Sequence, residues 1–135
     1  MKSIDTNILV RYYAQDDSLQ SPLALRIFKD KPERLVMKTV LLEFFRVLTQ
    51  ADKFRFSPEQ AMSVFEHLQG LPNVVIEDEL SLRTATAWCR AGIEFPDALH
   101  LAASRACSAF LTFDDRKFAR RAQGLNLTPV CEIPA

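Results

Sequence analysis

KSIDTNILV, residues 2–10, is the stretch that decides the fold of this chain. It predicts a short apolar strand that ends at Asp5 and a helix that begins directly after it. An Asp at such a junction has two interpretations. It caps the helix, because Asp is among the best N-cap residues. Alternatively, it binds a metal ion at the carboxyl end of a sheet strand, where open α/β folds bind their ligands.

Short apolar strands alternate with amphipathic helices along the rest of the chain. Glycine-rich phosphate loops are excluded, because only three glycines are present and each stands where a helix is expected to end. The alternation predicts an α/β fold with a central, mainly parallel sheet of four to five strands and about seven helices. We expect a single domain over residues 1–135. The strands are expected near 2–4, 34–37, 73–76, 109–113 and 128–131. The helices are expected near 6–13, from 21 to about 28, near 39–51, 58–70, 79–91 and 97–107, and after 114.

Composition narrows the class of protein. The chain has 135 residues, of which 48% are hydrophobic and 25% charged, as in an ordinary globular domain. No apolar run reaches the ~18 residues of a membrane span, and the early first strand leaves no room for a signal peptide. The three cysteines lack the spacing of zinc or redox motifs, so we expect a reduced, cytoplasmic protein. A net charge of zero argues against a polycation that binds nucleic acid nonspecifically, although local basic clusters remain.

Three further acids stand at comparable places. Asp114 follows the apolar run 110–113 and repeats the pattern of a strand followed by Asp. Asp97 follows a Phe-Pro pair and is expected to open the next helix, so capping is its simple explanation. Glu43 flanks the apolar stripe of its helix in VLLEFF, residues 40–45, and its simple explanation is a side chain that reaches out to water.

Together the four acids point to a metal site. A parallel sheet places the carboxyl ends of its strands at one edge, so Asp5 and Asp114 are expected to lie close together. Four carboxylates without a counter-ion repel one another, which raises their pKa values. Mg²⁺ or Mn²⁺ removes that cost, because hard cations prefer carboxylate and water oxygens. Such a site polarises a phosphodiester and activates a water molecule.

The four motifs in this order resemble the PIN domain, and more narrowly a VapC-type toxin of a bacterial toxin–antitoxin pair. The resemblance rests on DTNIL at 5–9, on Glu43 in its apolar helix, on FPDALHLA at 95–102 and on LTFD at 111–114. It covers essentially the whole chain. It implies a PIN-like three-layer α/β/α fold and a metal-dependent endoribonuclease that uses water as nucleophile and leaves a 5′-phosphate. It further implies Mg²⁺ (or Mn²⁺), an RNA substrate, a cognate VapB-like antitoxin and a homodimer. The acids that it assigns to catalysis and to metal binding are Asp5, Glu43, Asp97 and Asp114.

Three neighbouring polar residues are assigned by the same resemblance. Asn7 and Thr112 match polar positions beside the first and fourth acids, and we expect them to orient carboxylates or water. The family often has a single acid before its basic-aromatic turn, whereas this chain has Asp114 and Asp115. The strand spacing favours Asp114, and Asp115 remains open as a partner or a replacement.

A basic cluster follows these acids, and two interpretations of it stand. Arg116, Lys117 and Arg120 are suited to contact an RNA backbone beside the site, because phosphate contacts supply affinity. The same residues also fit a solvated helix face.

Two other functions compete with the nuclease. A Mg²⁺-dependent phosphatase-like hydrolase also has a strand followed by Asp, but it requires a second Asp two residues later, where this chain has Asn7. A catalytically silent PIN-like binding module would use its acids only as helix caps. For that module, Asp5→Ala costs about 1 kcal/mol of stability, whereas relief of carboxylate repulsion predicts no loss.

Overall fold

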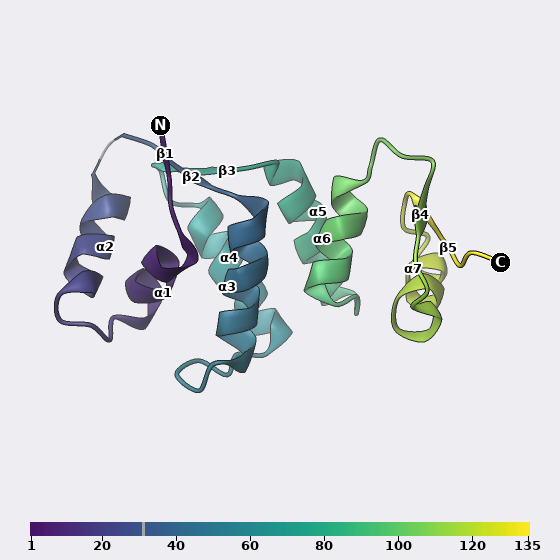
Figure 1. Ribbon diagram of the computed structural model, residues 1–135, viewed down its shortest axis with the longest axis horizontal. Coiled ribbons are helices and arrows are strands. Elements are labelled where there is room, and N and C mark those ends of the chain that lie inside the picture. The colour runs from purple at the N-terminus through teal and green to yellow at the C-terminus, as the bar shows by residue number, and fades with distance from the viewer. Residues whose placement is uncertain (31) are drawn as a thin grey trace. The chain divides into compact units, whose positions relative to one another are not determined.

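The computed structural model describes residues 1–30 and 32–135, which divide into the units Met1–Glu77 and Asp78–Ala135 (Figure 1). Each unit has its own parallel sheet and its own helices.

The first unit is built on a three-stranded parallel sheet. Its strands pair in the order β1–β2–β3, with Ser3 opposite Leu35 and Leu35 opposite Val75. Parallel neighbours require crossover connections, and helices supply them. In chain order the elements are β1 (Lys2–Ser3), α1 (Thr6–Ala14), α2 (Gln20–Lys29), β2 (Arg34–Val36), α3 (Lys38–Gln50), α4 (Pro58–Gln69) and β3 (Val74–Ile76).

Helices α3 and α4 supply much of the core of this unit. Val40, Phe44 and Leu48 recur every four residues on one face of α3 and are buried, as the sequence stripe predicts. The ring centroid of Phe44 lies 6.2 Å from the ring centroid of Phe65 on α4, and Phe65 is also fully buried. A capping box fixes the start of α4, because the Ser57 hydroxyl accepts from the Gln60 amide and the Gln60 side chain accepts from the Ser57 amide.

The second unit contains a helix pair and a two-stranded parallel sheet. Helices α5 and α6 pack against each other, and Ala109 pairs with Val130 at the start of the β4–β5 ladder. A short π-helix, η1, connects β4 to α7, and no sequence pattern predicts it. The elements are α5 (Glu79–Arg90), α6 (Phe95–Ala103), β4 (Ala109–Leu111), η1 (Asp115–Ala119), α7 (Arg120–Gly124) and β5 (Val130–Glu132).

The predicted α/β class, the parallel pairing and the seven α-helices are confirmed within the described residues. The expected sheet of four to five strands takes the form of a three-stranded and a two-stranded sheet, one in each unit. In residues 1–30 and 32–135, no helix combines the length and the apolar character that crossing a membrane demands.

Candidate active site

Asp5 and Glu43 belong to the first unit, and Thr6 contacts both. Asp5 is the N-cap of α1, where its Oδ1 accepts a hydrogen bond from the Thr6 amide at 2.7 Å. Helix α3 packs against α1 and carries Glu43, whose Oε2 accepts from the Thr6 hydroxyl at 3.3 Å. Both acids are exposed, whereas Thr6 is buried. Thr6 thus holds two candidate ligand carboxylates in place, one through its backbone and one through its side chain.

Sequence reasoning missed this role of Thr6. The residue reads only as the first position of a helix, and Glu43 lies 37 residues further along the chain. The contact comes from the packing of α1 on α3, for which the sequence holds no local signal. Only the DTN motif itself, in which a hydroxyl follows the first acid, could have drawn attention to it.

Asp97 does not cap its helix, and the prediction that it opens α6 is wrong. The N-cap is Glu94, the helix begins at Phe95, and Asp97 occupies its third position. The Phe-Pro pair lies inside the first turn, which tolerates proline because amide groups there have no partner within the helix. N-capping therefore does not account for this acid, whose negative charge in the first turn still favours the helix dipole.

The pKa of the Asp97 carboxyl is raised above its ordinary value. Partial burial is the main cause, and the nearby acids Glu94 and Asp114 add to it, while His100 acts in the opposite direction. Crowding of carboxylates is what the sequence predicts for a site that is completed by a cation. Asp97 and Asp114, which lie 17 positions apart in the sequence, are thus electrostatic neighbours within the second unit.

Asp114 and Asp115 are in different environments. Asp114 is the N-cap of η1, and its Oδ1 accepts from the Lys117 amide at 3.1 Å. Asp115 forms an ion pair with Arg120, with 2.8 Å between Nη2 and Oδ2. Asp115 is therefore already paired with a cationic side chain, whereas Asp114 accepts from a backbone amide.

The two polar neighbours take different positions. Thr112 accepts a hydrogen bond from the Asp114 amide at 3.0 Å, so it holds the backbone of that acid rather than its carboxylate. Asn7 is exposed in the first turn of α1. Both remain within two residues of the acid that they were assigned to support.

The acids can be compared with what a metal ion requires. Asp5 and Glu43 share Thr6 in the first unit, and Asp97 and Asp114 interact in the second. Across residues 1–30 and 32–135, no group of three or more His, Cys, Asp or Glu side chains is arranged to hold a metal ion. Each unit therefore contains two of the four candidate carboxylates, whose oxygens are the donors that hard divalent cations prefer.

The basic residues beside Asp114 fall into two kinds. Arg116 and Lys117 are exposed on η1. Arg120 pairs with Asp115, and Arg121 on α7 donates a hydrogen bond to the Gly92 carbonyl at 3.2 Å. The paired arginines serve the internal structure of this unit, so Arg116 and Lys117 are the better candidates for a ligand.

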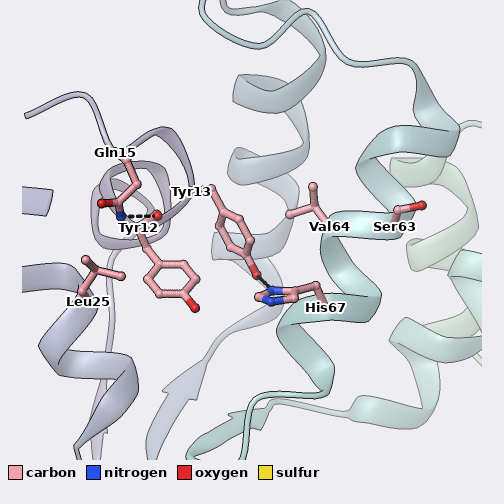
Figure 2. Close-up of a pocket in the computed structure, with 7 residues that line it drawn as sticks. All are labelled: Tyr12, Tyr13, Gln15, Leu25, Ser63, Val64 and His67. Carbon is pink, nitrogen blue, oxygen red and sulfur yellow. Dashed lines mark hydrogen bonds between the residues drawn. The ribbon is translucent and has the colours of Figure 1, made fainter.

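A pocket of about 460 Å³ lies in the first unit, between α1, α2 and α4 (Figure 2). A hydrogen bond of 2.8 Å joins the Tyr13 hydroxyl and Nδ1 of His67, and burial raises the pKa of Tyr13. His67 is exposed, and its partner Tyr13 lies 54 positions away in the sequence. The pocket is lined by Tyr12, Tyr13, Gln15, Leu25, Ser63, Val64 and His67.

Three comparisons with known proteins bear on the family and the fold of this chain. A family model described as the PIN domain matches residues 3–124. No curated protein matches the chain. Among solved structures, the crystal structure of Mycobacterium tuberculosis VapC20, described as a sarcin-ricin loop cleaving toxin, is similar over 96% of this chain and 98% of that one. The sequence identity is 18% and the TM-score 0.43.

Proposed function

Because the chain belongs to the PIN domain family, we propose that it is a metal-dependent endoribonuclease and the toxin of a toxin–antitoxin pair. The observation that carries the proposal is the state of Asp97. This acid lies in the first turn of α6 without capping it, and burial, Glu94 and Asp114 raise its pKa. Side chains whose pKa values are shifted by burial and by neighbouring like charges cluster at active sites.

We propose that the residues that bind Mg²⁺ or Mn²⁺ are Asp5 and Glu43 in the first unit and Asp97 and Asp114 in the second. Their carboxylate oxygens fit a hard divalent cation, and binding it would relieve the repulsion that raises the pKa of Asp97. A bound cation supplies Lewis-acid polarisation of the phosphodiester and lowers the pKa of an attacking water.

The reaction is the hydrolysis of an RNA phosphodiester. The oxygen of water bonds to phosphorus, the bond from phosphorus to O3′ breaks, and the 3′ oxygen takes up a proton, so the products carry a 5′-phosphate and a 3′-hydroxyl. Thr6 holds the Glu43 carboxylate through its hydroxyl. Thr112 holds the backbone of Asp114. We assign the fourth acid to Asp114 rather than Asp115, because Asp115 is paired with Arg120.

Partners follow from the same proposal. Arg116 and Lys117 contact the RNA backbone, while Arg120 acts indirectly by neutralising Asp115. A VapB-like antitoxin restrains the enzyme in the cytoplasm, and the active form is a homodimer. Growth arrest on expression that is relieved by Asp97→Asn tests the toxin, and sedimentation of the purified protein tests the dimer.

The first experiment compares purified wild type with Asp97→Asn on a single-stranded RNA, with Mn²⁺, Mg²⁺ or EDTA. We expect cleavage by the wild type with either metal, none with EDTA, and none by the variant. Calorimetric titration with Mn²⁺ gives a readout independent of turnover, and the variant should bind the ion at least tenfold more weakly. Products that are substrates for a 5′-phosphate-dependent exonuclease identify the end chemistry.

Asp115→Asn is the matched control, since it makes the same chemical change 18 residues away in an acid that is already paired. It should retain cleavage, whereas Asp114→Asn should abolish it. Equal cleavage by wild type and Asp97→Asn would reveal a contaminating ribonuclease and contradict the proposal. Absence of cleavage together with absence of Mn²⁺ binding would favour the silent binding module, for which the capping roles of Asp5 and Asp114 are sufficient.

A further inference from the structure

Phe113 is the most exposed large hydrophobic side chain among the described residues. Its side chain is 85% exposed and immediately precedes Asp114. Two other phenylalanines of this region pack against each other instead. The rings of Phe110 and Phe118 meet edge to face with their centroids 5.6 Å apart, and Phe118 is 1% exposed. The core of this region is thus formed without Phe113.

The backbone around Phe113 is fixed on both sides. The Thr112 amide donates to the Glu132 carbonyl at 3.0 Å, which extends the β4–β5 ladder by one residue. The Asp114 amide donates to the Thr112 hydroxyl, and the Lys117 amide donates to the Asp114 carboxylate. A ring held on an ordered turn loses little conformational freedom when it binds a ligand, which favours affinity.

Two cationic side chains follow Phe113 in the sequence. Arg116 and Lys117 follow within four residues and are exposed, and no ion pair to either is found in the described part of the chain. An exposed aromatic ring, followed in the sequence by a candidate catalytic acid and two exposed cations, matches one chemical class of ligand, which has a flat π surface and a phosphate. An unpaired nucleotide of a single-stranded RNA has both.

We propose that Phe113 stacks on a nucleobase next to the scissile phosphate, while Arg116 and Lys117 contact the adjoining backbone. This inference rests on the proposed ribonuclease and adds to it how the substrate is chosen. A stacked base must be free of its own neighbours, so the contact selects unpaired over paired RNA. It does not select one base strongly, because every base has a π face.

Steady-state kinetics on a single-stranded oligonucleotide test the proposal. Phe113→Leu keeps an apolar side chain but removes the π face, and it should raise KM roughly tenfold or more with kcat nearly unchanged. Phe113→Trp should keep KM within about threefold of the wild type, because indole also stacks. Leu111→Ala is the matched control, since Leu111 is 64% exposed at the end of β4, two residues before Phe113, and it should leave KM unchanged.

A spectroscopic signature separates stacking from general damage. In the Asp97→Asn background, an oligonucleotide that carries 2-aminopurine at the proposed position should lose fluorescence on binding, and Phe113→Leu should abolish that loss. A KM for Phe113→Leu equal to that of the wild type would overturn the stacking role while leaving the ribonuclease intact. Quenching that depends on Phe113 in a protein without metal-dependent cleavage would instead overturn the ribonuclease and keep the stacking. A change of oligomeric state in Phe113→Leu with unaltered kinetics would assign the ring to a protein contact and refute the inference.

Discussion

Thr6→Val separates the positioning of Glu43 from the stability of the fold. The substitution removes the hydroxyl that donates to Glu43 Oε2 and keeps a β-branched side chain of nearly the same shape at a site that is 7% exposed. The Asp5 cap on α1 is unaffected, because it uses the Thr6 amide. The variant therefore changes one contact of one candidate ligand.

The magnitude follows from the geometry of that contact. A hydroxyl donating to a carboxylate is strongest at about 2.5–2.7 Å, and the observed 3.3 Å places this bond at the weak end. Glu43 is exposed, so water replaces the lost donor and the free energy of unfolding should change by less than about 1 kcal/mol. Residues that orient metal ligands typically contribute about 10- to 100-fold to metal affinity. For this long bond we expect about tenfold, or about 1.4 kcal/mol.

Two measurements on the same preparation decide the outcome. Urea unfolding without metal gives the stability, and calorimetric titration with Mn²⁺ gives the dissociation constant. Thr49→Val serves as control, because the Thr49 hydroxyl donates to the Phe45 carbonyl within the same helix and away from Glu43. Unchanged Mn²⁺ affinity in Thr6→Val, or an equal loss in Thr49→Val, would refute the positioning role.

Two further predictions concern stability. Asp97→Asn should stabilise the metal-free protein at neutral pH, because the raised pKa of Asp97 means that its ionisation costs the folded state more than the unfolded one. That gain should shrink as the pH falls through the raised pKa toward the ordinary value of 3.8, below which both states are protonated, and urea unfolding across this range measures it. Ser57→Ala should cost about 1 kcal/mol in urea unfolding by removing the capping box of α4, with RNA cleavage retained. Its control is Ser63→Ala in the middle of the same helix, where alanine is the better helix former and no loss is expected. An equal loss in both serine variants would show that the cap has no special weight.

Local signals in the sequence were sufficient for several of these features. The capping box at Ser57 involves only the four residues Ser57 to Gln60, so a local sequence pattern is enough to predict it, and the structure contains it. The apolar stripe of α3 repeats with the period of a helix and identifies the buried face. Asp5 follows a strand and begins a helix, and the cap that this implies is present.

Other features depend on contacts that no local pattern encodes. The start of α6 was misplaced because a proline fits both before a helix and in its first turn, and only the structure shows that Phe95 begins the helix. The π-helix after β4 depends on a hydrogen-bond spacing that lacks a sequence signature. The sequence leaves Asp114 and Asp115 open as the fourth acid, and it does not show that Arg120, five residues on, pairs with Asp115.

The distribution of the four acids along the chain has a consequence for synthesis. Two of them precede residue 77 and two follow residue 78, so no fragment that ends before Asp114 carries the whole set. For a nuclease of the proposed kind, the nearest RNA during translation is that of the ribosome and the message being read. A nascent chain would then remain inert until Asp114 had been made, and the arrangement would act as a timing safeguard. Premature termination before Asp114 would yield harmless polypeptides rather than unregulated fragments.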